Sequence, residues 1–133
     1  ATRDDLKWLT LLWKEWFTED PPPFHSAKYA LEVQLKAFRL ALETGIALVV
    51  PHEAALLWGA GNLGDVYDMG LFVRKPYRAK GLGGALMTRA AQLAKERGFE
   101  RVFISPLDTN PRSGEWLSQN GFNRYSVTYV KEL

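Results

Sequence analysis

The stretch that decides the fold is MGLFVRKPYRAKGLGGAL, residues 69–86. An apolar run ends at Val73, a basic turn follows, and the chain then reaches Gly81-Leu82-Gly83-Gly84 and a long helical pattern. This order predicts a strand, a glycine-rich loop and a helix. The first amides of a helix have no intrahelical partner and carry partial positive charge. We therefore expect the loop to bind a phosphate group.

Two common phosphate-binding motifs do not fit this loop. A Walker A motif ends in Gly-Lys-Ser or Gly-Lys-Thr, and a Rossmann fingerprint needs a third small residue where this chain has Leu86. The stretch that does fit a known pattern is Arg78-Ala79-Lys80-Gly81-Leu82-Gly83, preceded by Leu71-Phe72-Val73. It resembles the R-x-x-G-x-G motif with which the GNAT family of N-acetyltransferases binds acetyl-CoA.

The residues before this stretch predict two helices and three strands. Thr2 is expected to cap a first helix that ends within residues 18–23, and Ser26 to cap a second helix that Gly45 ends. The apolar face of the second helix is predicted to be Leu31, Leu35, Phe38 and Leu42. The strands are expected at Ile46–Val50, Ala54–Ala60 and Val66–Val73. Short turns join them, which favours an antiparallel meander.

The residues after the loop predict a parallel crossover. The helix ends at Gly98, and Arg101–Ser105 is predicted to be a buried strand beside the strand that ends at Val73. Asn110 should cap a short helix, and Phe122–Val130 should form a last, half-buried strand. The fold class is therefore mixed α/β in one domain, residues 1–133, with an antiparallel meander, then a parallel β-α-β crossover, and helices flanking the sheet.

Composition narrows the function classes. The chain has 133 residues, 47% of them hydrophobic, and no cysteine, and its two histidines, His25 and His52, lie far apart, so no metal site is expected. No apolar run is long enough to cross a membrane, so a cytoplasmic protein is expected. Residues 74–133 carry 11 Lys or Arg against 5 Asp or Glu, whereas residues 1–73 carry 6 against 10. The basic half suits a polyanion such as coenzyme A, and we expect no nucleic-acid partner.

The resemblance to the GNAT family extends to residues 46–130. Asn110 and Gly121-Phe122 are similar to the family's N-x10-G-F element. The resemblance implies that the two parallel strands splay apart and that the pantetheine of acetyl-CoA pairs with backbone groups near Leu71 and Val73, close to Asn110. It also implies a pyrophosphate on the amides of Arg78, Ala79, Lys80, Gly81, Leu82, Gly83 and Gly84. An amide of Phe72 or Val73 would stabilise the oxyanion.

The implied reaction is direct acetyl transfer from acetyl-CoA to a primary amine. Tyr67 takes the place where some relatives have a base, and Asp68 and Asp65 are alternatives. Strand alternation predicts Tyr67, Met69, Leu71 and Val73 on one face and Asp68 on the other. The family's usual tyrosine acid is replaced by Leu117, so the substitutes are Ser118, Tyr125 or Tyr129.

Two departures leave other interpretations open. Leu117 makes a noncatalytic acyl-CoA-binding or regulatory domain the competing hypothesis. Family members usually open with a strand, whereas Thr2 is expected to be a helix cap here. We therefore expect either that this strand is absent and a sheet edge is uncovered, or that another segment takes its place. The acceptor amine and the oligomeric state, a homodimer included, are not predicted by the sequence.

Overall fold

The computed structural model describes residues 1–19, 27–61, 64–105, 111–125, 129, 131 and 133. Its sheet has the order β1-β2-β3-β4, with β1 (Ile46–Val50), β2 (Ala54–Ala60), β3 (Asp65–Val73) and β4 (Arg101–Phe103). The first three strands pair antiparallel, and β4 pairs parallel to β3. The predicted meander and crossover are confirmed.

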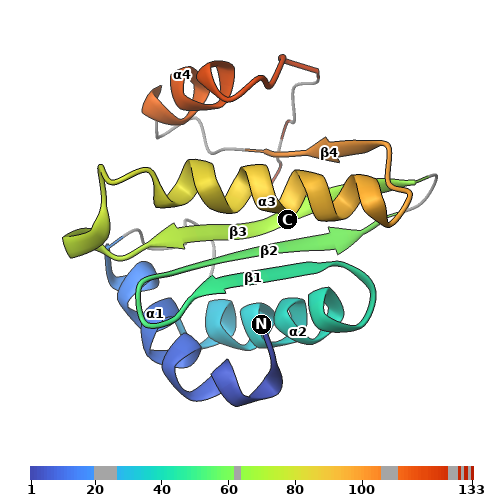
Figure 1. The fold of residues 1–133 in the computed structure, drawn as a ribbon. Coiled ribbons are helices and arrows are strands. Elements are labelled where there is room, and N and C mark those ends of the chain that lie inside the picture. The colour runs from blue at the N-terminus through green and yellow to red at the C-terminus, as the bar shows by residue number, and fades with distance from the viewer. Residues whose placement is uncertain (20–26, 62–63, 106–110, 126–128, 130, 132) are drawn as a thin grey trace.

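Helices cover both faces of this sheet (Figure 1). On one face lie α1 (Leu6–Glu19) and α2 (Ala27–Thr44), and on the other lies α3 (Leu82–Glu96). The short α4 (Pro111–Gln119) lies beside α3. Each face has its own core: Trp13 and Phe38 are buried under α1 and α2, and Trp58 under α3.

The N-terminal cap forms as predicted. The Thr2 hydroxyl accepts a hydrogen bond from the Asp4 amide, and the Asp5 carboxylate accepts one from the Thr2 amide. This reciprocal capping box starts a 3-10 turn, Arg3–Asp5, that leads into α1. In the described sheet β1 is an edge strand. The Ala1 amino group donates to the Ala47 carbonyl on it, at 3.1 Å.

The predicted buried face of α2 was partly wrong. Phe38 is fully buried, but Leu31, Leu35 and Leu42 are only partly buried. The deepest positions beside Phe38 are instead Ala30, Gln34 and Ala41. Small alanines let the helix approach the sheet closely, and the long leucines fill the sides. Gln34 is tolerated there because its side-chain amide donates to the Met69 carbonyl at 3.2 Å.

The last two predicted strands also needed correction. β4 is only three residues long, Arg101 is exposed, and Ile104 and Ser105 lie beyond it, so this strand is not fully buried. Residues 122–125 form no strand, and the other predicted strand residues include 126–128 and 130, which lie outside the described residues. A three-residue β4 gives a further strand little backbone to pair with.

A β-bulge in β3 makes the predicted strand faces partly wrong: Tyr67 and Met69 lie opposite Asp68 as predicted, but Leu71 and Val73 do not share their face. Trp58 of β2 pairs with Asp68 and Leu57 pairs with Gly70, which leaves Met69 as an extra residue. The extra residue shifts the alternation by one position. Asp68 therefore lies on the α3 face with Leu71 and Val73, whereas Tyr67 shares the α1 and α2 face with Met69 and Phe72.

Candidate active site

The candidate site begins where β3 and β4 separate. The two strands pair only from Asp65 with Arg101 to Tyr67 with Phe103, and β3 then continues to Val73. No described strand pairs with that continuation, so it forms an open edge. The predicted divergence of the two strands is present, and it starts at the bulge.

The ladder determines which backbone groups this open edge offers. The Arg74 amide donates to the Glu53 carbonyl next to β2, at 2.9 Å. Because backbone groups alternate in direction along a strand, the amide and carbonyl of Phe72 also face β2, and those of Leu71 and Val73 face away from it. Leu71 thus keeps both polar groups predicted for pantetheine, whereas Val73 keeps its amide and its carbonyl accepts a hydrogen bond from Arg78 at 2.8 Å. Of the two amides considered for the oxyanion, only that of Val73 is directed to the open edge.

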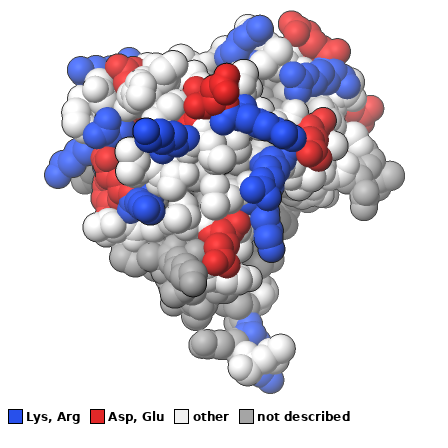
Figure 2. Space-filling model, turned by 90° about the horizontal axis from the view of Figure 1, so that it is seen from below, with Lys and Arg blue, Asp and Glu red and all other residues white. Residues whose placement is uncertain are grey.

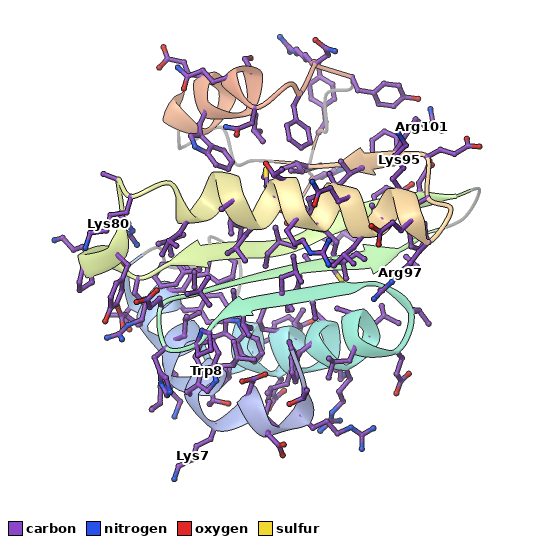
Figure 3. The ribbon with its side chains drawn as sticks, viewed as in Figure 1. Lys7, Trp8, Lys80, Lys95, Arg97 and Arg101 are labelled. Atoms are coloured by element: carbon purple, nitrogen blue, oxygen red, sulfur yellow. The ribbon has the colours of Figure 1, made fainter. Side chains whose placement is uncertain are left out.

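The glycine-rich loop leaves its backbone donors available. Gly81 caps α3 with a positive φ of 79°, and its carbonyl accepts the Ala85 amide at 3.0 Å. Among the described residues, none accepts a hydrogen bond from the amides of residues 79–84. Lys80, at this end of α3, projects away from the helix in Figure 3. These amides and the helix dipole form a site that favours an anion.

The glycines of this loop differ in what an added side chain would meet. A Cβ on Gly81 would meet nothing within 4 Å, so its lack of a side chain serves backbone conformation and open space. A Cβ on Gly83 would lie 3.3 Å from the Trp116 ring, and one on Gly84 would lie 3.6 Å from the Asn120 side-chain oxygen. Gly83 thus lets Trp116 of α4 pack closely on α3, a Cβ on Gly84 would make only an ordinary contact, and Gly81 keeps the mouth of the loop free.

The basic turn contains Arg74, Lys75, Arg78 and Lys80, and its two arginines already form ion pairs. The Arg78 guanidinium forms an ion pair with Glu19, donates to the Val73 carbonyl at 2.8 Å and lies over the Phe72 ring. Arg74 pairs with Glu15 at 3.0 Å. On the face that α1 and α2 cover, basic and acidic side chains alternate (Figure 2). The predicted role of Arg78 at the pyrophosphate therefore requires its side chain to leave Glu19.

Asp68 has the environment of a perturbed carboxyl group. It lies at the bulge, where its Oδ1 accepts the Gly70 amide at 3.1 Å. Burial raises the pKa of the Asp68 carboxyl to about 6, against the opposing effects of the Gly70 amide and the Trp58 indole. The Trp58 N–H is fully buried and has no partner of good hydrogen-bond geometry among the described residues. A carboxyl group of this kind can exchange protons near neutral pH.

Two other candidates meet on the opposite face of the sheet. The Tyr67 ring stacks on Phe103 at 5.3 Å, and Tyr125 meets Phe103 edge-on at 5.1 Å. Gly61 leaves room for this stack, because a Cβ there would lie 2.1 Å from the Tyr67 ring. Tyr67 and Tyr125 remain 47% and 73% exposed. The structure thus brings these two hydroxyl-bearing rings together at the end of the β3–β4 pairing, and separates them from Asp68.

The remaining candidates are scattered or outside the described residues. Ser118 is exposed on α4, and its neighbour Leu117 packs against the core under α3. Asp65 is buried and paired with Arg101 at 3.1 Å, which gives it a structural role. Tyr129 is exposed, and Asn110 lies outside the described residues.

The described residues offer neither a metal-binding cluster nor a membrane-spanning helix. These residues contain no group of three or more histidine or acidic side chains that could hold a metal ion. Their helices are each too short or too polar to cross a membrane. His52 contacts Trp8, with ring centroids 5.3 Å apart, and His25 lies outside the described residues.

Sequence reasoning missed two residues at this site. Phe103, the ring between Tyr67 and Tyr125, was expected only as part of a buried strand. Glu19 was not predicted to contact the loop, because its ion pair joins residues 59 positions apart. A signal was present: Glu15 and Glu19 are four residues apart, as are their partners Arg74 and Arg78.

Comparisons with known proteins agree with this geometry. The sequence model of the acetyltransferase (GNAT) family matches residues 7–122. The fold is similar to the PaiA N-acetyltransferase of Thermoplasma acidophilum, solved in complex with coenzyme A, with a TM-score of 0.76 and 15% identity, over 96% of this chain and 89% of that one. It is also similar to a GNAT-family acetyltransferase of Staphylococcus aureus, with a TM-score of 0.72 and 15% identity, over 95% and 83%.

A third similar structure is named for its acceptor. An aminoglycoside antibiotic 6′-N-acetyltransferase of Acinetobacter haemolyticus matches with a TM-score of 0.67 and 18% identity, over 100% of this chain and 95% of that one. At these identities the likeness establishes a shared fold and leaves the acceptor open.

Proposed function

The chain belongs to the acetyltransferase (GNAT) family, and from that premise we propose that it transfers an acetyl group from acetyl-CoA to a primary amine by direct attack in a ternary complex. The amine nitrogen forms a bond to the thioester carbonyl carbon, and the carbon–sulfur bond then breaks. A base takes one proton from the ammonium before the attack, and the nitrogen loses a second proton to solvent as the tetrahedral intermediate collapses. The departing thiolate takes up one proton from an acid or from water. The products are an N-acetylated amine and free coenzyme A.

The observation that carries the proposal is the combination of an open strand edge with unpaired loop amides. Leu71 and Val73 offer backbone groups to a pantetheine arm, and the amides of residues 79–84 offer donors to a pyrophosphate. Asn110 belongs to the proposal as a residue near the pantetheine. In this arrangement the Val73 amide is the proposed oxyanion donor.

Asp68 is the proposed base. Its raised pKa keeps it mostly ionised at pH 7, yet basic enough to take a proton, directly or through a water molecule. Tyr67 is the alternative base, because it lies beside the same end of the open edge. For the thiolate, Tyr125 and Ser118 are the candidate acids, and Tyr125 is favoured by its ring contact in the Phe103 stack.

The test of the proposal has a binding step and a transfer step. Acetyl-CoA and coenzyme A should raise the melting temperature, whereas AMP and ATP at the same concentration should raise it much less. Release of free thiol should then depend on an added amine. Absence of any shift with acetyl-CoA would contradict the assignment of the loop.

A noncatalytic acyl-CoA-binding domain remains the second candidate. The observation that favours it is Leu117, which packs against the core at the place of the family's usual tyrosine acid. This alternative predicts the same thermal shift with acetyl-CoA but no thiol release above the background rate with any member of a broad amine panel.

The proposal includes the wider setting expected from the sequence. We take residues 1–133 as one acetyltransferase-like domain that acts in the cytoplasm on an amine acceptor, without nucleic acid, membrane or metal. Gel filtration with light scattering would establish whether it is a monomer or a homodimer.

A further inference from the structure

Two ion pairs of the same kind join α1 to the basic turn. Glu15 pairs with Arg74, and Glu19 pairs with Arg78. Their side chains are similarly exposed, 37% for each glutamate and 35% and 39% for the arginines. Solvent therefore weakens both pairs to a similar degree.

The two arginines differ in what else they contact. Arg74 donates a second hydrogen bond to the His52 carbonyl, in the turn between β1 and β2, on the paired side of β3. Arg78 donates instead to the Val73 carbonyl at 2.8 Å, and its guanidinium lies 5.2 Å from the centre of the Phe72 ring. Since the Val73 carbonyl faces the open edge, the Arg78 side chain lies across the part of β3 where the donor is proposed to bind.

We propose that Arg78 exchanges its partner when coenzyme A binds, leaving the Glu19 carboxylate for the diphosphate. This inference rests on the proposed function, because it assumes the diphosphate sits at the loop amides of residues 79–84. Glu19 lies outside the motif, and in this proposal it competes with the diphosphate for the Arg78 guanidinium and so lowers the affinity for coenzyme A.

The chemistry of the groups favours this exchange. A diphosphate carries more negative charge than one carboxylate and presents several oxygens to the planar guanidinium fork. An exposed ion pair such as that of Arg78 with Glu19 is weak in water, so breaking it costs little free energy. Lys75 would remain near Glu19 after Arg78 leaves, since both Arg78 and, to a smaller degree, Lys75 lower the pKa of the Glu19 carboxyl. Glu19 and Lys75 both line a shallow hollow of about 460 Å³.

The experiment compares two substitutions on the same helix. Glu19→Gln should tighten coenzyme A binding about two- to fivefold, because it removes the competing carboxylate. Glu15→Gln removes the same charge four residues away, from the pair that Arg74 makes, and should leave the dissociation constant within the error of the measurement. Isothermal titration calorimetry at one fixed salt concentration measures both, and melting curves check that both variants fold.

A double substitution separates exchange from long-range charge. Arg78→Gln alone should weaken coenzyme A binding, and adding Glu19→Gln to it should then change nothing, because the arginine for which Glu19 competes is gone. An unchanged dissociation constant for Glu19→Gln alone, equal tightening by Glu15→Gln, or tightening that persists in the Arg78→Gln background would each overturn the exchange. Failure of the wild-type chain to bind coenzyme A would overturn the proposed function itself, which is a distinct result.

Discussion

The two edges of β3 use the same backbone in opposite ways. Toward β2, the strand is paired along its whole length, from Val66 to Val73, with one interruption at the bulge. Toward β4, it is paired at three positions only, and the last of them is Tyr67. The backbone groups of one edge are bonded within the sheet. Most of those on the other edge, beyond Tyr67, are available to a ligand.

The bulge shows how a strand can leave a ladder without losing hydrogen bonds. The Gly70 amide is satisfied by the Asp68 carboxylate, and the Met69 carbonyl by the Gln34 side chain from α2. Buried backbone groups need such partners, so side chains replace the missing strand neighbour where the pairing is irregular. The contrast teaches that the sheet and its helices stabilise the fold on one side of β3 so that the other side can stay open.

The largest expected effect comes from closing the mouth of the open side with Gly81→Glu. The new carboxylate would occupy the space in front of the loop amides, so coenzyme A affinity should fall at least 100-fold, measured by calorimetry, through charge repulsion and lost access. The left-handed backbone at Gly81 should also lower stability by about 1 kcal/mol.

Gly98 provides a matched control for this strain. It follows the other end of α3, has a φ of 86°, and a Cβ there would also meet nothing within 4 Å. Gly98→Glu should therefore lower the melting temperature to a similar degree and leave coenzyme A binding unchanged. Equal loss of binding in both variants would mean that strain in α3, and not blocked amides, explains the effect.

A second pair of substitutions compares the two edges of β3 by placing proline at two neighbouring residues whose amides face opposite edges. Val73→Pro removes an amide directed to the open edge, where a proline is tolerated as it is on edge strands. The chain should fold and bind coenzyme A, but acetyl transfer should fall by ~10²–10³, the usual effect of losing an oxyanion donor. Thiol release under saturating acetyl-CoA measures this loss.

Phe72→Pro is the counterpart on the closed edge. It removes an amide that faces β2 and a buried aromatic ring, so we expect a loss of more than about 3 kcal/mol and no stable fold. Circular dichroism melts compare the two variants. If Val73→Pro unfolds the chain as Phe72→Pro does, the two edges do not differ in the way the ladder register indicates.

Local signals predicted the parts of this comparison that depend on short stretches of chain. The cap at Thr2, the glycines before α3 and the order of strands all follow from patterns within a few residues. The bulge was the main feature that was not predicted. Gly70 inside a strand was a signal for it, and the φ of Gly70 is 142°. One extra residue moved Leu71 and Val73 to the face of Asp68, away from the face of Tyr67 and Met69.

Contacts between distant segments could not be predicted in this way. The packing of Trp116 against Gly83 and the pairing of Glu19 with Arg78 depend on how α4 and α1 dock, which no local pattern encodes. The sequence therefore identified the loop that offers its amides, but not the side chain that lies across the neighbouring edge. The roles of the candidate catalytic residues stay predictions, because they depend on the neighbours that the bulge and the docked helices give each side chain.

The smallest expected effect separates the two carboxylates at the start of β3. Because burial raises the pKa of Asp68 to about 6 in the fold, the folded chain holds that proton more tightly than the unfolded chain. This contribution to stability is present below about pH 4 and is lost as the pH rises through 6. Asp68→Asn keeps an oxygen for the Gly70 amide and removes the charge. It should stabilise the chain by about 1 kcal/mol at pH 8 and hardly at all at pH 4.

Activity should change in the opposite direction. If Asp68 is the base, Asp68→Asn should lower kcat by about 10², and wild-type kcat/KM should fall as the pH drops through 6. Asp65→Asn is the contrasting variant: it breaks the pair with Arg101 and should cost about 1–2 kcal/mol, with kcat retained. A stabler but inactive Asp68→Asn would mean that β3 keeps a destabilising charge for its chemistry. A stabler and fully active one would restrict Asp68 to closing the bulge and leave Tyr67 as the base.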